Sequence, residues 1–148
     1  MMRRATRADL PAIVALLADD TLGAGREDAS LPLNAAYLSA FEAIERDENQ
    51  FLAVAEQDGA LLGCLHLTFL PGISRLGAWR GQVESVRVAA AARGSGLGRR
   101  MLEWAAETAR ARGCTLVQLT TDKTRPEAHR FYESLGYQPT HIGYKLPL

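Results

Sequence analysis

Hydrophobic positions in the first part of the chain switch from a strand pattern to a helix pattern. A short strand is predicted over Met2–Arg4, and the helix that follows ends near Ala18. Thr6 and Asp9 have the spacing of a capping box at the start of that helix. The apolar residues that recur at helical spacing along it are Leu10, Ile13, Val14, Leu16 and Leu17.

The next part of the chain predicts a loop, a second helix and a hairpin. Glycine, proline and several carboxylates indicate a loop over Asp19–Asn34, and apolar residues at helical spacing predict a helix over Ala35–Arg46. Phe51–Glu56 and Leu61–Leu70 are typical of strands. The Asp58-Gly59 pair between them favours a tight hairpin turn.

A third strand-like segment then leads into the strongest helical pattern of the chain. A loop is predicted over Pro71–Gly81 and a strand over Gln82–Val88, where β-branched residues recur. Leu97–Arg112 carries apolar residues along one side and is followed by Gly113, which suits the position just after a helix.

The last part of the chain predicts strand, helix and strand. Cys114–Thr121 is a strand, a helix begins at Pro126 and ends near Leu135, and His141–Leu146 is a final strand. Strands and helices that alternate in this way predict an α/β fold with a mixed sheet and helices on its faces.

Composition indicates one globular domain over residues 1–148, with 47% hydrophobic and 23% charged residues. Seventeen basic residues balance seventeen acidic ones, so no overall field attracts nucleic acid or an anionic membrane. The N-terminus has no apolar signal core, and no run approaches the ~20 apolar residues of a membrane span, so we expect a cytoplasmic protein. Cys64 and Cys114 stand alone in apolar stretches, which indicates buried, reduced thiols and no metal site.

The junction between the predicted strand and the long helix reads VRVAAAARGSGLGRR over residues 86–100. A glycine turn that opens a helix presents unpaired backbone N–H groups to an anion. A phosphate-binding P-loop is excluded because Arg99 stands where Lys is required, and the dinucleotide fingerprint is excluded because Arg99 also replaces its third glycine. The remaining pattern is Arg-x-x-Gly-x-Gly, formed by Arg93, Gly96 and Gly98.

Two motifs in order resemble those of one enzyme family. VRVAAAARGSGLGRRMLEWA is similar to the acetyl-CoA-binding motif of the GNAT (GCN5-related) N-acetyltransferases, and AHRFYESLGY, residues 128–137, resembles their second motif. MRRATRADLPAIVALL is similar to the family's first strand and helix, so the resemblance covers nearly the whole chain. It implies a twisted, mostly antiparallel sheet of about six to seven strands flanked by about four helices.

The resemblance also implies how acetyl-CoA, the co-substrate, would bind. Backbone amides from Gly94 to Arg99 would hold the pyrophosphate, and the pantetheine arm would fill a gap between the strand ending at Val88 and the strand Cys114–Thr121. Arg125 stands where the family often has Asn, and we expect it to reach a phosphate instead. The residues expected at acetyl-CoA are Val86, Val88, Arg93, Gly94, Ser95, Gly96, Leu97, Gly98, Arg99, Arg125, Ala128 and Tyr132.

Three groups are expected to perform the transfer to an amine. The resemblance places the Val88 N–H at the thioester carbonyl oxygen and Tyr132 beside the sulfur as general acid. Glu84 is the candidate general base, acting directly or through water, and strand alternation predicts that its side chain shares a face with Val86 and Val88. His66 and His129 are interpreted as packing or solvated residues, although His66 could face the acceptor.

The acceptor pocket is expected between the Asp19–Asn34 loop, the second helix and the Pro71–Gly81 loop. Their charges conflict, because carboxylates of the first loop favour a cationic polyamine whereas Arg75, Arg80 and His66 favour an amine with an acid group. The stretch from Gln118 to His141 is similar to the tail of aminoalkylphosphonate acetyltransferases, which favours the second class.

Other functions stay open at this stage. The same fold would suit a protein N-terminal or lysine acetyltransferase, or a coenzyme-binding regulatory module without catalysis. A nucleic-acid adaptor would rest only on arginines at the two ends of one helix, and we expect no nucleic-acid or membrane partner. A homodimer is left open.

Overall fold

The computed structural model describes residues 1–148 and contains one sheet of five strands in the order β1-β2-β3-β4-β5. The first three junctions are antiparallel and the β4–β5 junction is parallel. The mixed, mostly antiparallel sheet is therefore confirmed, with five strands instead of six to seven. The strands are β1 (Met2–Arg4), β2 (Gln50–Gln57), β3 (Ala60–Leu70), β4 (Trp79–Val88) and β5 (Cys114–Leu119).

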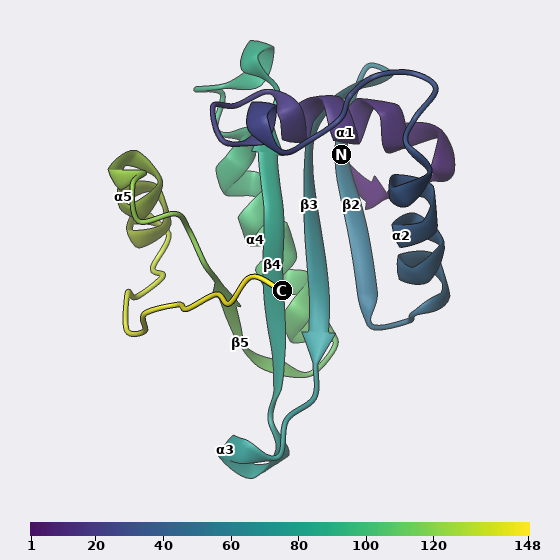
Figure 1. Ribbon diagram of the computed structural model, residues 1–148. Coiled ribbons are helices and arrows are strands. Elements are labelled where there is room, and N and C mark those ends of the chain that lie inside the picture. The colour runs from purple at the N-terminus through teal and green to yellow at the C-terminus, as the bar shows by residue number, and fades with distance from the viewer.

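Helices cover both faces of this sheet (Figure 1). Two of them lie on one face, the long α4 lies on the other, and α5 lies beside the β5 edge. No helix has the length and apolar character that crossing a membrane requires. The helices are α1 (Leu10–Ala18), α2 (Ala35–Arg46), α3 (Ser74–Gly77), α4 (Leu97–Ala111) and α5 (Pro126–Ser134), with 3-10 turns at Arg7–Asp9, Gly23–Gly25 and Ala90–Ala92.

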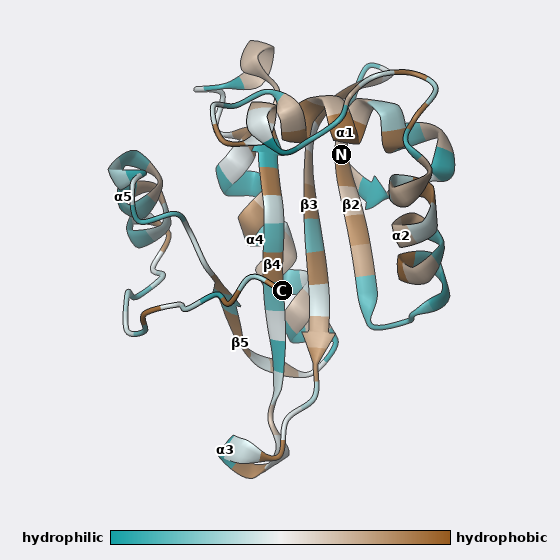
Figure 2. Cartoon of the chain, viewed as in Figure 1, coloured by the Kyte–Doolittle hydropathy of each residue, from teal (hydrophilic) through white to brown (hydrophobic).

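Alternation along the strands divides the core into two clusters, one on each face of the sheet. On β3, Leu65 and Leu67 join the cluster under α4, whereas Cys64 joins the cluster under α1 and α2. Figure 2 shows the matching alternation of hydrophobic and hydrophilic residues along the central strands. Burial raises the pKa of the Cys64 thiol to about 12, which suits a packing role. Cys114 is only half-buried, in contrast to the expectation.

Local turn chemistry matches the sequence prediction at two places. Asp58 and Gly59 have φ angles of 52° and 78°, the left-handed pair that a two-residue hairpin requires. The Asp9 carboxylate accepts a hydrogen bond of 2.7 Å from the Thr6 N–H, as expected of a capping box.

One predicted strand boundary and one predicted strand are wrong. Strand β4 begins at Trp79 instead of Gln82, because the β3–β4 pairing continues to Leu70 and Arg80. His141–Leu146 forms no strand and makes no backbone hydrogen bond within the chain. Its alternating sequence has the pattern of a strand, but a strand also needs a neighbour with which to pair.

Candidate active site

A gap opens where β4 and β5 separate. The two strands pair from Trp79 with Cys114 as far as Val83 with Leu119, and β4 then continues alone to Val88. The N–H of the next residue, Ala89, donates to Leu62 of β3 at 2.8 Å. Because successive N–H groups of a strand point in opposite directions, the Val88 N–H points away from β3 and into the gap.

An extra residue in β4 reverses the strand's faces beside this gap. His66 of β3 lies opposite Glu84, but Cys64 lies opposite Arg87, so β4 carries one more residue than β3 between these pairs. Ser85 has a φ of 56°, typical of a β-bulge.

The bulge corrects the predicted orientation of Glu84. Val86 and Val88 pack against the cluster under α4, whereas Glu84 lies opposite His66 and shares its side of the sheet. Simple alternation through residues 84, 86 and 88 is therefore wrong, because the bulge shifts the period by one residue. The same shift places Arg87 on the face that carries Cys64 and Glu84.

The glycine turn leaves several backbone amides without an acceptor in the chain. Gly94 and Gly96 have φ angles of 78° and 79°, and Gly96 caps the N-terminus of α4. The backbone N–H groups that find no acceptor within the chain are those of Gly94, Gly96, Leu97, Gly98 and Arg99. Ser95 differs, because its N–H and its hydroxyl both donate to the Ala92 carbonyl and brace the turn. Unpaired amides at a helix N-terminus form an anion site.

Gly98 is the point where three elements meet. A Cβ placed there would lie 3.3 Å from the ring of Phe131 on α5 and 3.7 Å from Cγ2 of Val88 on β4. An alanine there would make ordinary van der Waals contact with Val88, but the Phe131 ring would have to move by a few tenths of an ångström.

A cavity of about 470 Å³ lies at the mouth of the gap. Its volume falls within the range of small-ligand sites. The cavity brings together four residues expected at acetyl-CoA, together with Arg87 and the end of the loop after α1. Its lining residues are Asp19, Asp20, Thr21, Val86, Arg87, Val88, Arg93 and Arg125. Leu97 instead packs on the core and Ala128 is half-buried on α5.

Ion pairs hold the loop after α1 against this cavity. Arg87 Nε lies 3.0 Å from an Asp20 carboxylate oxygen, and Arg93 lies 3.5 Å from Asp19. Burial raises the pKa of Asp20, but a hydrogen bond from the Gly23 N–H and the charge of Arg87 outweigh it, so the pKa is lowered overall. Arg87 Nε is buried and makes no hydrogen bond, since the Asp20 carboxylate is poorly aligned with its N–H.

Arg87 is the site residue that sequence reasoning missed. Regular alternation from Glu84 would turn its side chain to the opposite face, and no sequence pattern marks the bulge at Ser85. Asp20 and Thr21 likewise reach the cavity through contacts between segments that are distant in sequence.

Tyr132 lies half-buried on α5 among aromatic rings. Its ring centroid is 5.4 Å from that of Phe131 and 5.9 Å from that of Tyr137, and its hydroxyl makes no hydrogen bond within the chain. Burial raises the pKa of Tyr132, and the positive charges of Arg125 and Arg87 oppose the rise. The phenol therefore remains protonated at neutral pH.

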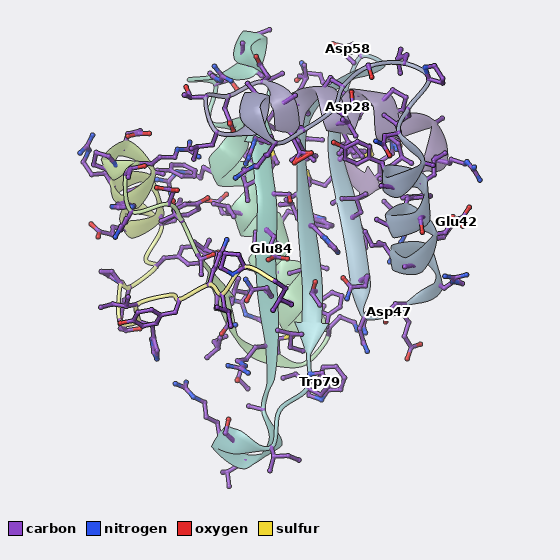
Figure 3. The ribbon with its side chains drawn as sticks, viewed as in Figure 1. Asp28, Glu42, Asp47, Asp58, Trp79 and Glu84 are labelled. Carbon is purple, nitrogen blue, oxygen red and sulfur yellow. The ribbon has the colours of Figure 1, made fainter.

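Two of the segments expected at the acceptor pocket, the Asp19–Asn34 loop and the Pro71–Gly81 loop, lie at opposite ends of β4. Figure 3 shows Glu84 near the middle of the strand and Trp79 at its start, next to the hairpin tip. The loop after α1 lies at the other end of the strand (Figure 1). The prediction that this loop and the Pro71–Gly81 loop line one pocket is therefore wrong. His66 bonds to Gln50 at 2.7 Å and His129 bonds to the Asp122 carbonyl at 2.8 Å.

Comparisons with known proteins agree with this geometry. The model of the acetyltransferase (GNAT) family matches residues 11–137. An aminoalkylphosphonate N-acetyltransferase of Salmonella typhimurium is 31% identical over 109 residues, which are 74% of this chain and 70% of that protein. A glucosamine 6-phosphate N-acetyltransferase of Trypanosoma brucei brucei is 35% identical over 91 residues, 61% of this chain and 59% of that protein.

A solved structure from Bacillus halodurans C-125, described as a transcriptional regulator, superposes with a TM-score of 0.97. It is 46% identical and is matched over 100% of this chain and 99% of its own. A family match over most of the chain, with N-acetyltransferases among the relatives, shows that this chain belongs to the GNAT family of N-acetyltransferases, whose members use acetyl-CoA as co-substrate.

Proposed function

We propose that this protein transfers the acetyl group of acetyl-CoA to the primary amine of a small molecule that also carries an anionic group. The observation that carries the proposal is the cavity at the end of β4, which three arginines, Arg87, Arg93 and Arg125, line. The unpaired amides of the glycine turn follow Arg93 directly in the chain. The amides suit a pyrophosphate, and the unpaired edge of β4 suits a pantetheine arm.

Binding of acetyl-CoA is tested by thermal unfolding of the wild type and of a Gly96→Val variant. Wild-type protein should be stabilised by ~2.7 kcal/mol when acetyl-CoA is present at 100 times its dissociation constant, and NADH and ATP should stabilise it less. The variant should lose this stabilisation, because valine disfavours the φ of 79° that opens the turn.

Gly113→Val is the matched control, since Gly113 also has a positive φ, at the other end of α4. It should lower the melting temperature and keep the response to acetyl-CoA. A wild type that acetyl-CoA does not stabilise would refute the proposed site.

Direct attack by the amine requires two proton transfers and one oxyanion donor. As the C–N bond forms and the C–S bond breaks, the Val88 N–H would stabilise the carbonyl oxygen. The amine proton would pass to Glu84, directly or through water, and Tyr132 would protonate the departing thiolate. The Tyr132 phenol is protonated at neutral pH and its hydroxyl has no partner within the chain, so it has a proton to donate to the thiolate.

Tyr132→Phe should lower kcat by about 100-fold, because general acid catalysis typically contributes that much or more. Its dissociation constant for acetyl-CoA should stay within about twofold, since only the hydroxyl is removed and that hydroxyl has no partner in the chain. Tyr137→Phe removes a neighbouring hydroxyl and should keep wild-type turnover. Equal kcat values for the two variants would exclude Tyr132 as the acid.

Glu84→Gln should displace the pH profile of kcat/KM towards higher pH, because the amine must then lose its proton without help from a base. Glu42→Gln removes an exposed carboxylate of α2 and should leave the profile unchanged. If the Glu84→Gln profile overlays that of the wild type, another group or solvent accepts the proton.

The charges around the loop after α1 favour an anionic acceptor over a polyamine. Asp19 and Asp20 face arginines, and Glu27 and Asp28 accept hydrogen bonds from Tyr37 and Ser30, respectively. These carboxylates are therefore already paired, and three arginines, Arg87, Arg93 and Arg125, line the cavity beside only two of them. The aminoalkylphosphonate and glucosamine 6-phosphate of the relatives' names are both amines that carry a phosphonate or phosphate.

Arg87→Gln should raise KM for an aminoalkylphosphonate by about 10-fold or more, as expected when a charged hydrogen bond is lost. KM for an amine without an acid group, and for acetyl-CoA, should change by less than about threefold. Arg80→Gln, at the far half of β4, serves as control. A parallel rise of KM for acetyl-CoA would instead assign Arg87 to the coenzyme.

A regulatory module that binds acetyl-CoA without catalysis is the second candidate. It is favoured by the description of the 46% identical relative as a transcriptional regulator. Stabilisation by acetyl-CoA without thiol release across a panel of amines would support it, and turnover that depends on Tyr132 would exclude it.

A further inference from the structure

Hydrogen bonds between β2 and β3 hold His66 in one tautomer. The side-chain oxygen of Gln50 accepts from the Thr68 hydroxyl at 2.9 Å and lies 2.7 Å from His66 Nε2. An amide oxygen can only accept, so Nε2 carries the proton of the second bond. Burial lowers the pKa of His66, and the charge of Glu84 opposes the fall only in part, so the imidazole is neutral at neutral pH. Nδ1 therefore keeps a lone pair that meets no donor within the chain.

The lone pair on Nδ1 lies on the side of the ring that faces β4. The two nitrogens of an imidazole stand on opposite sides of its Cβ–Cγ axis, and Nε2 is directed to Gln50 on β2. The residue directly opposite His66 on the other side of β3 is Glu84, which lies near the middle of β4 (Figure 3). Side chains that are opposite on one face have Cβ atoms about 4.5–5.5 Å apart. Two hydrogen-bond acceptors, Nδ1 and the Glu84 carboxylate, are therefore neighbours on this face.

The space between these two acceptors is accessible and adjoins the gap beside β4. Glu84 is exposed and His66 is half-buried, and neither a hydrogen bond nor an ion pair joins the two side chains. Val83 is the last residue of β4 that pairs with β5, so Glu84 is the first residue beyond that pairing. The same free stretch of β4 ends at Val88, whose N–H is expected at the thioester carbonyl oxygen. An amine that reaches this stretch of β4 therefore meets both acceptors.

We propose that His66 is a specificity-determining residue whose Nδ1 accepts one hydrogen bond from the substrate amine while Glu84 accepts the other. This role rests on the proposed function, because it requires an amine that is acetylated beside Glu84. A neutral primary amine has two N–H bonds and one lone pair. When each N–H is directed to one of the two acceptors, the lone pair is oriented for attack on the thioester carbon.

This arrangement selects a primary amine over a secondary one. As the C–N bond forms and the C–S bond breaks, the N–H that faces Glu84 loses its proton to the carboxylate, and Tyr132 protonates the thiolate. The other N–H stays in the amide product and remains bonded to Nδ1, so His66 binds the amine and takes no proton. A secondary amine has a single N–H, which leaves either His66 or Glu84 without its partner.

Two substitutions distinguish this role from a structural one. His66→Gln keeps a polar atom at the position of Nε2 and removes the acceptor at Nδ1, whereas His66→Asn can place an oxygen at the position of Nδ1 and removes the bond to Gln50. With the primary amine that releases thiol fastest, His66→Gln should lower kcat/KM by about 10-fold or more, and His66→Asn by less than about threefold. With the N-methyl derivative of that amine, both variants should stay within about threefold of the wild type.

Four results would overturn the role of His66 in a wild type that turns over: no loss in His66→Gln, equal losses in the two variants, a larger loss in His66→Asn, or an equal loss in His66→Gln with the N-methyl derivative. A wild type that releases no thiol with any amine would refute the proposed function, and this role with it. Both variants should keep the stabilisation by acetyl-CoA, which checks that they fold.

Nuclear magnetic resonance of isotope-labelled histidine nitrogens tests the tautomer without turnover. The signals of His66 are identified by their absence from His66→Gln. At neutral pH the wild type should have a protonated Nε2 and an unprotonated Nδ1, and the primary amine added together with CoA should shift the Nδ1 signal more than the Nε2 signal. A proton on Nδ1, or an Nδ1 signal that the amine does not shift, would overturn the proposal.

Discussion

The incomplete pairing of β4 with β5 is the constraint on which the site depends. A strand in the interior of a sheet normally satisfies its backbone groups on both sides, and β4 does so only as far as Val83. Beyond that residue its edge faces a gap, and the glycine turn, the start of α4 and α5 all meet there. The contact of Gly98 with both Val88 and Phe131 explains why these three elements open onto one space.

The bulge at Ser85 gives this part of β4 its chemistry. By adding one residue it keeps Val86 and Val88 on the core side and brings Arg87 to the face that carries Glu84. Arg87 then meets Asp20, so the loop after α1 is anchored to the cavity by charge as well as by chain connection. The cost of a left-handed φ at a serine, typically about 1 to 3 kcal/mol, is consistent with a bulge that positions a site.

The same sheet has a second unpaired edge, on the outer side of β5. Both unpaired edges arise because β5 is short and is followed by α5 at one corner of the sheet, which directs the remaining chain across the sheet instead of along its edge.

Local patterns in the sequence determined most of the elements. The period of apolar residues predicted α2 and α4 closely, and the Asp58-Gly59 pair predicted its hairpin, because helix faces and two-residue turns depend on neighbours in sequence. The unpaired amides of the glycine turn after Arg93 were also predictable, since they depend only on the local conformation at the start of a helix.

Only the tertiary structure decided where the gap lies, how far β4 extends, and which side chains face it. Arg87 entered the site through a one-residue bulge, and His141–Leu146 remained unpaired although its pattern is that of a strand. In both cases the outcome depends on which backbone groups a neighbouring strand offers, and such long-range pairing leaves no period in the sequence of either partner.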